Sequence, residues 1–457
     1  MNETSLEENV EWTVGIDSGS REHVVRMLDA GCHSVGKHKF EHSGRGIGTL
    51  IDWVLKGCNG EPNRVAVATE APHGPVVEGL LERGCGMYAM NPKQMAGFRG
   101  RMSPAEVKDD ERDAWILAQT LRVDTYAYRR VELGGALYVR LRDLSRTRQK
   151  IEKEIVRLTN YLWQHLHRYF PQMLGVGSME EAWVRELWKR APSPERAQRL
   201  TQRWVAQLLR THRISRTSAA AVLQALQAPP VPAAPGVVES AIAQIEYALP
   251  RLTLLMDQRK RCERELEALL QEMQDEPAPD PGAPAALSAE GLCLEERADQ
   301  DALAPADQPG EENAQPPSDV AVILSCPGAG VMVASSLLSE APDLIRDRDY
   351  AALRCHGGTA PVTCQSGTVR RVTMRYACNP RIRNGVRNWA LKSLRSDPNS
   401  RAYYDDLRAA GVHHERALRS VADRWLRILT AMLREHSLYD PTRCVYRARG
   451  LPAHAAA

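Results

Sequence analysis

The stretch Val10-Glu-Trp-Thr-Val-Gly-Ile-Asp17-Ser18 decides the fold of the amino-terminal part of the chain. Apolar and polar residues alternate along it with the period of a half-buried β-strand, and it ends on a carboxylate before a Ser-Gly-Ser turn. Two further strands fit Glu22–Leu28 and His33–Glu41, after which helical and strand patterns alternate. This order predicts an α/β domain with a mixed central sheet over residues 10–125.

Five more elements are predicted in this domain. They are a helix at Gly48–Lys56, a buried strand at Arg64–Thr69, a helix at Pro75–Arg83, a strand at Met87–Met90 and a long helix at about Pro104–Leu121. The last helix opens with Ser103-Pro-Ala-Glu106, in which Ser and Glu three residues apart form a capping box and Pro takes the first helical position. Asp110 and Asp113 then lie one turn apart on the same face of this helix.

Four carboxylates stand at positions where the fold brings them together. Asp17 ends the first strand, Glu70 ends a later one, and Asp110 and Asp113 share a helix face. Converging carboxylates can hold two Mg²⁺ ions roughly 3.5–4 Å apart, as in enzymes that attack phosphodiesters. The structural alternative is that these acids only cap strand ends and form a solvated helix face. All four together, at these places, favour a metal site.

Composition restricts the class of protein. The net charge of 457 residues is only +3, but residues 276–318 carry ten acidic residues and eight prolines against a single Arg297, whereas residues 319–457 carry twenty-one basic residues against twelve acidic ones. The first segment predicts a disordered acidic linker, and the second a domain with a nucleic-acid partner. Ten scattered cysteines, an acidic amino terminus and no apolar run of membrane length predict a cytoplasmic protein without a membrane segment.

Residues 136–275 predict a helical coiled-coil dimerisation region. Apolar residues recur with alternating spacings of four and three, which is the coiled-coil pattern, at Leu137, Leu141, Leu144, Ile151, Ile155, Leu158 and Leu162. A second such series runs from Ile242 to Met273, with a kink expected at Pro250. The two helices pair either with each other or across a dimer. Arg148 and His165, at seam positions, either contact nucleic acid or set the register.

Residues 319–440 form a mostly helical carboxyl domain, followed by a tail over residues 441–457. Val320–Ser325, the glycines Gly328 and Gly330, and Val333–Ser339 resemble a helix-hairpin-helix, in which backbone N–H groups take a phosphate. Simple packing of the two helices is the equal alternative. Further helices are predicted at Asn384–Ser396 and Arg416–Arg434.

A Ser-Gly turn lies inside the most basic part of this domain, in Thr359-Ala-Pro-Val-Thr-Cys-Gln-Ser366-Gly-Thr-Val-Arg-Arg371. Residues 350–396 hold nine Lys and Arg residues and no carboxylate. Such uncompensated charge indicates contact with a polyanion. From spacing alone, Ser366 is more often an ordinary turn residue than a nucleophile. The candidate nucleic-acid contacts are Arg370, Arg371, Arg375, Arg381, Arg383 and Arg387.

Several of these motifs resemble one family. Gly-Ile-Asp17, Thr-Glu70-Ala, Tyr-Ala-Met-Asn91-Pro92 and Lys108-Asp-Asp110-Glu-Arg-Asp113-Ala are similar to the amino domain of the DEDD transposases of the insertion-sequence one-hundred-ten family. These are relatives of the Piv/MooV invertases and are bridge-RNA-guided recombinases. Ala360-Pro, Gln-Ser366-Gly, Arg370-Arg and Asn379-Pro-Arg-Ile-Arg resemble its carboxyl transposase domain. The chain departs from the family at Pro72-His73, Asp109 and Cys378.

The resemblance implies a RuvC-like amino domain of RNase H-like fold. It implies that Asp17, Glu70, Asp110 and Asp113 bind Mg²⁺, as two ions, with Asp109 as the alternative to Asp110, and that Ser366 is the nucleophile that links to DNA. The implied function is an RNA-guided DNA transposase of an insertion sequence, acting in the bacterial cytoplasm. The implied partners are double-stranded DNA, an element-encoded guide RNA, and further copies of the chain in a dimer or tetramer.

Two other functions remain open from the sequence. One is a magnesium-dependent, structure-specific nuclease or Holliday-junction resolvase, in which Ser366 is structural. The other is a non-catalytic scaffold that binds nucleic acid and uses its carboxylates only for stability.

Overall fold

The computed structural model describes residues 9–102, 109–131, 135–275, 316–367 and 369–446. They form two compact units, which we describe separately. The first unit contains the described residues up to Val139 together with Arg346–Cys355, and the second contains residues 140–275, 316–345 and 356–446. None of the helices in the described ranges is long and apolar enough to cross a membrane. The predicted acidic linker lies outside the described residues, apart from residues 316–318.

A six-stranded sheet is the centre of the first unit, with the strand order β3-β2-β1-β4-β5-β6. The strands are β1 (Trp12–Ser18), β2 (Glu22–Leu28), β3 (Ser34–Glu41), β4 (Val65–Thr69), β5 (Gly86–Met90) and β6 (Tyr128–Val131). β1, β4 and β5 are parallel, whereas β2, β3 and β6 pair antiparallel with their neighbours. The predicted mixed α/β domain is confirmed. The short strand β6 was not predicted, because four residues carry too little periodicity to be recognised.

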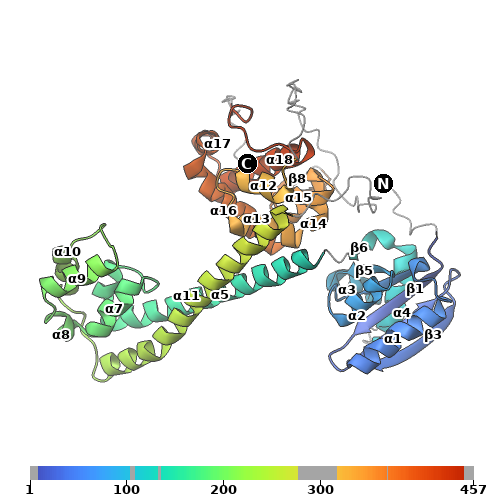
Figure 1. Cartoon of the computed structure of the whole chain (residues 1–457), viewed down its shortest axis with the longest axis horizontal. Coiled ribbons are helices and arrows are strands. Elements are labelled where there is room, and N and C mark those ends of the chain that lie inside the picture. The colour runs from blue at the N-terminus through green and yellow to red at the C-terminus, as the bar shows by residue number, and fades with distance from the viewer. Residues whose placement is uncertain (1–8, 103–108, 132–134, 276–315, 368, 447–457) are drawn as a thin grey trace. The chain divides into compact units, whose positions relative to one another are not determined.

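Helices cover both faces of the sheet (Figure 1). The first pair is α1 (Gly44–Gly57) and α2 (Pro75–Glu82), and the second pair is α3 (Pro92–Met102) and α4 (Asp110–Val123). α1 and α2 enclose one apolar core against β1, β2 and β4, which includes Val14, Ile16 and Val67. α3 and α4 enclose the other, built around Ala66, Ala68 and Leu117. The fully buried strand β4 contributes to both cores.

Two features of α3 and α4 differ from the prediction. Helix α3 was not predicted. Asn91-Pro92 marks its start, since the Asn91 side chain accepts a hydrogen bond from the backbone N–H of Lys93 at 2.9 Å. α4 begins at Asp110 and not near Pro104, because the extended residue Asp109 is its cap and accepts a hydrogen bond from the Glu111 N–H. Asp is among the strongest amino-terminal caps. The predicted capping box lies outside the described residues.

Strand β1 and helix α4 cross in very close contact at Gly15. A Cβ atom at this position would lie 1.9 Å from the carbonyl oxygen of Ala114 and 2.6 Å from the amide nitrogen of Ala118. A glycine inside a strand often marks such a close approach of another backbone. Because Gly15 is two residues before Asp17 and Ala114 follows Asp113, this crossing fixes the distance between the two acidic residues.

We expect Gly15→Ala to destabilise the first unit by about 2–3 kcal/mol, the usual cost of overpacking a core. The matched control is Gly97→Ala in α3, where an added Cβ meets nothing within 4 Å. That control should be neutral or slightly stabilising, since Ala favours helix. Thermal and chemical denaturation measure both. Equal effects of the two substitutions would show that β1 and α4 do not approach each other in this way.

The second unit begins with a long antiparallel pair of helices, α5 (Ala136–Tyr169) and α11 (Val237–Asp275) (Figure 1). Three polar contacts run between the helices, and they show that the two are antiparallel. The pairs are Arg140 with Glu272, Arg148 with Glu263, and Tyr161 with Gln244. The two helices therefore pair with each other within one chain, and α11 continues through Pro250.

Arg148 has a structural role in this helix pair. Its guanidinium donates two hydrogen bonds to one Glu263 oxygen, at 3.1 and 2.8 Å, and lies 3.3 Å from Glu152. His165 packs edge-on against the ring of Tyr161. The contact of Arg148 with Glu263 joins the two helices and matches the interpretation that it sets the register, whereas the contact of His165 lies within α5 and leaves its role a prediction.

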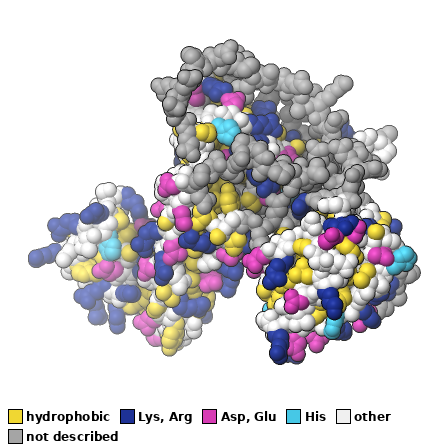
Figure 2. All heavy atoms as spheres, turned by 45° about the vertical axis from the view of Figure 1, so that its right-hand side comes forward, with side chains coloured by type: hydrophobic (Ala, Val, Ile, Leu, Met, Phe, Trp, Pro, Cys, Tyr) yellow, Lys and Arg dark blue, Asp and Glu magenta, His cyan; other side chains and the backbone are white. Residues whose placement is uncertain are grey.

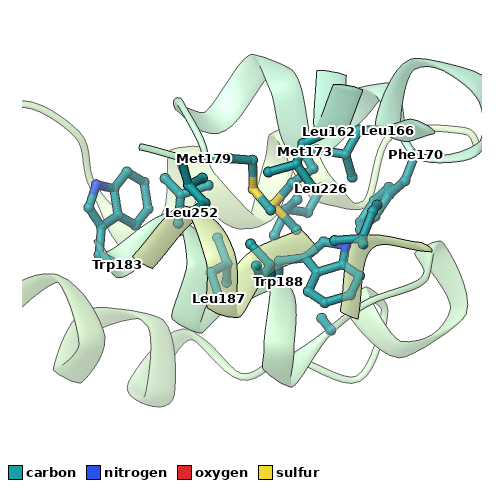
Figure 3. Packing of buried hydrophobic residues seen from close by; sticks show 14 of the residues in the cluster. Leu162, Leu166, Phe170, Met173, Met179, Trp183, Leu187, Trp188, Leu226 and Leu252 are labelled. Atoms are coloured by element: carbon teal, nitrogen blue, oxygen red, sulfur yellow. The ribbon is translucent and has the colours of Figure 1, made fainter. Parts of the chain in front are cut away.

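Five short helices pack around one end of this pair. They are α6 (Pro171–Val176), α7 (Ala182–Arg190), α8 (Pro194–Ala197), α9 (Gln202–Thr211) and α10 (Ala219–Leu226). Trp183 and Trp188 of α7 are buried among leucine and methionine side chains of the surrounding helices (Figure 3). The Trp188 indole N–H donates to the Tyr169 hydroxyl at 3.0 Å, which satisfies its only polar group.

The carboxyl-terminal part is mostly helical, as predicted. Its elements are α12 (Asp319–Ser325), α13 (Val331–Glu340), α14 (Pro342–Arg346), α15 (Tyr350–His356), the hairpin strands β7 (Val362–Ser366) and β8 (Val369–Thr373), α16 (Pro380–Ser396), α17 (Pro398–Ala409) and α18 (His414–Arg434). Trp389 of α16 is fully buried and stacks on Trp425 of α18, with ring centroids 5.2 Å apart. Its role is packing of the core, and it is not available to stack on a nucleic-acid base.

A buried carboxylate, Glu340, ties α5, α13 and α16 together. It receives hydrogen bonds from Arg146 at 2.8 and 3.2 Å and from the Asn379 side chain at 3.0 Å, and Arg381 lies 3.5 Å away. Burial alone would raise the pKa of Glu340, but the hydrogen bonds from Arg146 and Asn379 outweigh it and hold the pKa below 4.5. The sequence gives no sign of this cluster, because its members lie far apart in the chain.

We expect Glu340→Gln to lower the free energy of unfolding by about 2 kcal/mol at pH 7, because Arg146 loses its charged partner. Since the pKa of Glu340 is depressed in the folded state, its contribution is complete above pH 4.5 and is lost as the pH falls through the lower folded value. The difference between wild type and variant should therefore narrow in acid. Chemical denaturation at pH 7 and pH 4 measures it, and a difference independent of pH would contradict an ionised Glu340.

Candidate catalytic site

Three of the four predicted carboxylates lie around one guanidinium group, that of Arg99 in α3. Its Nε and Nη2 donate to the two oxygens of Asp113, each at 2.7 Å, and Nη2 also donates to Glu70 at 3.0 Å. Asp17 is close enough to interact with Arg99 electrostatically. The fold thus brings together the end of β1, the end of β4 and the first turn of α4.

The burial of these groups makes the contact a strong one. The Asp113 side chain is only 1% exposed, Arg99 is 22% exposed and Glu70 is 29% exposed. Hydrogen bonding to Asp113 raises the pKa of Arg99, supported by the charges of Asp113, Glu70 and Asp17 and opposed by burial. A bidentate Arg–carboxylate pair in a partly buried place has more fixed geometry than an exposed ion pair. The cluster is therefore held in one arrangement by Arg99.

Asp110 is placed differently from the other three. It is the first residue of α4 and is exposed, as is the cap residue Asp109. The next residue, Glu111, accepts a hydrogen bond from Lys37 of β3 at 2.7 Å, which lowers the pKa of Glu111. Asp110 is thus exposed to solvent, one helical turn from Asp113. The choice between Asp109 and Asp110 as a ligand remains a prediction.

The chemistry of these groups fits a divalent cation, whereas their present arrangement fits a guanidinium. Asp17, Glu70 and Asp113 are hard oxygen ligands of the kind that Mg²⁺ prefers. In the part of the chain that the structure describes, however, no three His, Cys, Asp or Glu side chains are arranged to hold a metal ion. The positive charge at the centre of the carboxylates is supplied by Arg99.

Ser366 lies at the tip of an exposed hairpin. It is the last residue of β7 and pairs with Val369 of β8, and Gly367 in the turn has φ +57°, which favours glycine. All five residues of β8 and four of β7, including Ser366, are exposed. Arg370 and Arg371 sit on β8 opposite Gln365 and Cys364. The hairpin therefore presents a hydroxyl and two arginines on one open ribbon.

Two of the arginines predicted to contact nucleic acid are paired with acidic side chains from outside the basic segment. Arg387 forms a bidentate pair with Glu415 at 2.9 and 2.6 Å, and Arg381 lies 3.5 Å from Glu340. On the parts of the surface that grey atoms leave visible, Figure 2 shows Lys and Arg side chains interspersed with Asp and Glu. The excess of positive charge in the sequence is thus partly neutralised in the fold.

The other two candidate arginines near α16 are half-buried. Arg383 lies against the sulfur of Cys378, with Nη1 3.9 Å from Sγ. The Nε of Arg375 is buried and has no hydrogen-bond partner in the described structure. Neither contact identifies a nucleic-acid site, and their roles stay predictions.

The two glycines between α12 and α13 differ in their surroundings. Gly328 has φ +79°, and a Cβ there would lie 2.8 Å from the amide nitrogen of Ser393 in α16. An added Cβ at Gly330, the cap of α13, would meet nothing within 4 Å. Gly328 is therefore required for packing of α12 and α13 against α16. A phosphate contact at Gly330 stays a prediction.

Sequence reasoning did not find Arg99 and Gly15. Arg99 lies among Phe98, Gly100 and Arg101 in a helix that itself was not predicted, and its partners are 14 and 29 residues away. The only available signal was a glycine inside the strand that carries Asp17.

The chain is similar to known transposases. Residues 14–171 match a family model described as a transposase, and residues 320–405 match one described as the transposase IS116/IS110/IS902 family. A putative transposase, y4uE, of Sinorhizobium fredii is 38% identical over 207 residues, which are 45% of this chain and 58% of that protein. The mini-circle putative transposase for IS117 of Streptomyces coelicolor is 25% identical over 94% of this chain and 95% of its own length.

The two family models and these relatives identify the class of the protein as a DNA transposase. The chain belongs to the IS116/IS110/IS902 family of transposases, and the resemblance seen in the sequence is confirmed.

The burial of Asp113 generates a prediction for the pair of aspartates on α4. Asp113→Ala should destabilise α4 by about 3 kcal/mol, because it leaves the partly buried Arg99 without its main partner. Asp110→Ala, the matched control, should cost less than about 1 kcal/mol, the usual contribution of an exposed acid in the first turn of a helix. Hydrogen exchange of the α4 amides measures both. Comparable losses would mean that the two aspartates are equally buried.

Proposed function

We propose that this transposase cuts and rejoins DNA strands through a phosphoserine intermediate on Ser366, with help from a divalent cation, Mg²⁺, at the carboxylate cluster. The observation that supports the proposal most directly is the convergence of Asp17, Glu70 and Asp113 on one cationic position. The proposal further assigns double-stranded DNA as substrate, an element-encoded RNA as guide, and a dimer or tetramer as the working assembly.

The carboxylates would hold the metal from three separate elements. Asp17, Glu70 and Asp113 would be its ligands, and the exposed Asp110 would complete the set. When bound, a divalent cation stabilises the charge that develops on the scissile phosphate and on the leaving oxygen. The residues of the chain contribute position. Gly15 allows β1 to approach α4, and burial prevents Asp113 from turning away.

Ser366 supplies the nucleophile of the proposed reaction. Its Oγ forms a bond to phosphorus while the bond from phosphorus to one deoxyribose oxygen breaks, so the phosphodiester is exchanged for a phosphoserine ester. The serine loses a proton and the leaving deoxyribose oxygen gains one. The second step reverses this exchange with a different DNA end, which conserves the bond energy for rejoining.

The exposed hairpin suits this role because it presents Ser366 to a large substrate without obstruction. Arg370 and Arg371 on the neighbouring strand can neutralise phosphate charge, and the planar guanidinium group favours bidentate contact. Guide RNA and oligomer formation rest on the family resemblance alone and are part of the proposal on that basis.

A covalent adduct tests the serine step. Wild-type protein, incubated with Mg²⁺, cognate DNA and RNA, should yield a protein–DNA adduct that survives denaturation. After protease digestion, a short peptide should remain attached to the DNA. Ser366→Ala should abolish the adduct completely, since no other group forms the bond. The matched control is Ser396→Ala, which removes an exposed hydroxyl at the end of α16 and should leave the adduct unchanged.

Two other outcomes would replace the proposal. Free DNA ends produced by Ser366→Ala, with cutting lost in Asp17→Ala, would identify a metal-dependent nuclease or junction resolvase. Unchanged nucleic-acid binding by both variants, without cutting by the wild type, would identify a binding scaffold.

A further inference from the structure

Arg99 occupies the centre of the proposed metal site, and the proposed function makes no use of it. Its guanidinium touches both oxygens of Asp113 and one oxygen of Glu70, all within 3.0 Å, with Asp17 nearby. A divalent cation at the centre of the same three carboxylates would take the place of the guanidinium, and two positive groups in contact there would repel each other. Arg99 and the metal therefore cannot both make these contacts.

The carboxylates require a positive charge whether or not metal is present. Asp113 is almost fully buried, and Glu70 and Asp17 lie close to the same guanidinium group. Like charges in a partly desolvated place repel strongly, and an unpaired buried carboxylate is costly. Without a cation this end of the sheet would be strained, and Arg99 removes the strain while the site lacks metal.

We infer that Arg99 is an internal substitute for the metal ion: it holds Asp17, Glu70 and Asp113 in place in the metal-free protein and must leave before a divalent cation binds. The inference rests on the proposed metal site and adds to it a competition between two cations. Arg99 lies in α3, the last element before residues 103–108, and its 22% exposure leaves its side chain a path to solvent. It is a positioning residue and takes no part in the bond changes.

The competition has a measurable size. Suppose that about one molecule in ten has the Arg99 side chain withdrawn from the carboxylates. The metal then binds with an apparent affinity about tenfold weaker than its affinity for that withdrawn form. Removing Arg99 should therefore tighten binding by about tenfold or more, which is opposite to the effect of removing a ligand.

The test measures Mn²⁺ binding to the full chain by electron paramagnetic resonance and by calorimetry, without DNA or RNA. Arg99→Gln should bind Mn²⁺ at least about tenfold more tightly than wild type. Its metal-free melting temperature should fall and recover when Mn²⁺ is added. The matched control is Arg101→Gln, which lies on the same helix, pairs with Asp124 at 3.2 Å and should change neither property.

A double variant shows where the metal binds and guards against misfolding. Arg99→Gln with Asp113→Asn removes both the buried charge and its partner, so it should fold without metal and lose the gained Mn²⁺ binding. Unchanged or weaker Mn²⁺ binding by Arg99→Gln, in a wild type that does bind Mn²⁺, would overturn the inference and leave the proposed function intact. Failure of wild type and Arg99→Gln alike to bind Mn²⁺ would overturn both the inference and the metal dependence.

Discussion

The bidentate contact between Arg99 and Asp113 is the interaction on which the arrangement of the amino-terminal unit depends. It joins α3 to α4 and, through Glu70, joins both helices to the end of β4. Without a cation at this point the buried Asp113 would carry an unpaired charge close to two partly exposed acids. The fold therefore builds an anionic site and fills it with a cation from the same chain.

The backbone makes this meeting of acids possible. Gly15 lets β1 lie directly against α4, so that residues nearly a hundred positions apart share one site. The parallel pairing of β1 with β4 places Asp17 and Glu70 at the same edge of the sheet. In the second unit the numbers of acids and donors are reversed. There a single buried acid, Glu340, accepts hydrogen bonds from Arg146 of α5 and from Asn379, the cap of α16. In both units, ion pairs between distant segments determine how helices meet.

Periodicity and turn residues sufficed to predict β1 to β5, α1 and α2, and the acids at the ends of β1 and β4, because these patterns are local. They missed β6 and α3. Asp17 and Glu70 were recognised because each ends a predicted strand, and Asp113 because it lies one helical turn from Asp110 on the same face. Arg99 was not, since an arginine on an amphipathic helix has no local mark, and only the folded chain shows which acids it meets. For the same reason Arg387 was predicted to contact nucleic acid, whereas the structure pairs it with Glu415. The tip of the hairpin with Ser366 was recognisable as a turn, whereas the catalytic role proposed for Ser366 rests on the family resemblance.

The central claim is that the carboxylates of β1, β4 and α4 form one cation site that Arg99 and a divalent metal occupy in turn. Anomalous X-ray diffraction from crystals grown with and without Mn²⁺ tests it most directly. We expect a manganese peak within coordination distance of Asp17, Glu70 and Asp113, with the Arg99 side chain displaced from Asp113. A peak elsewhere, or Arg99 still bound to Asp113 beside a bound metal ion, would contradict it.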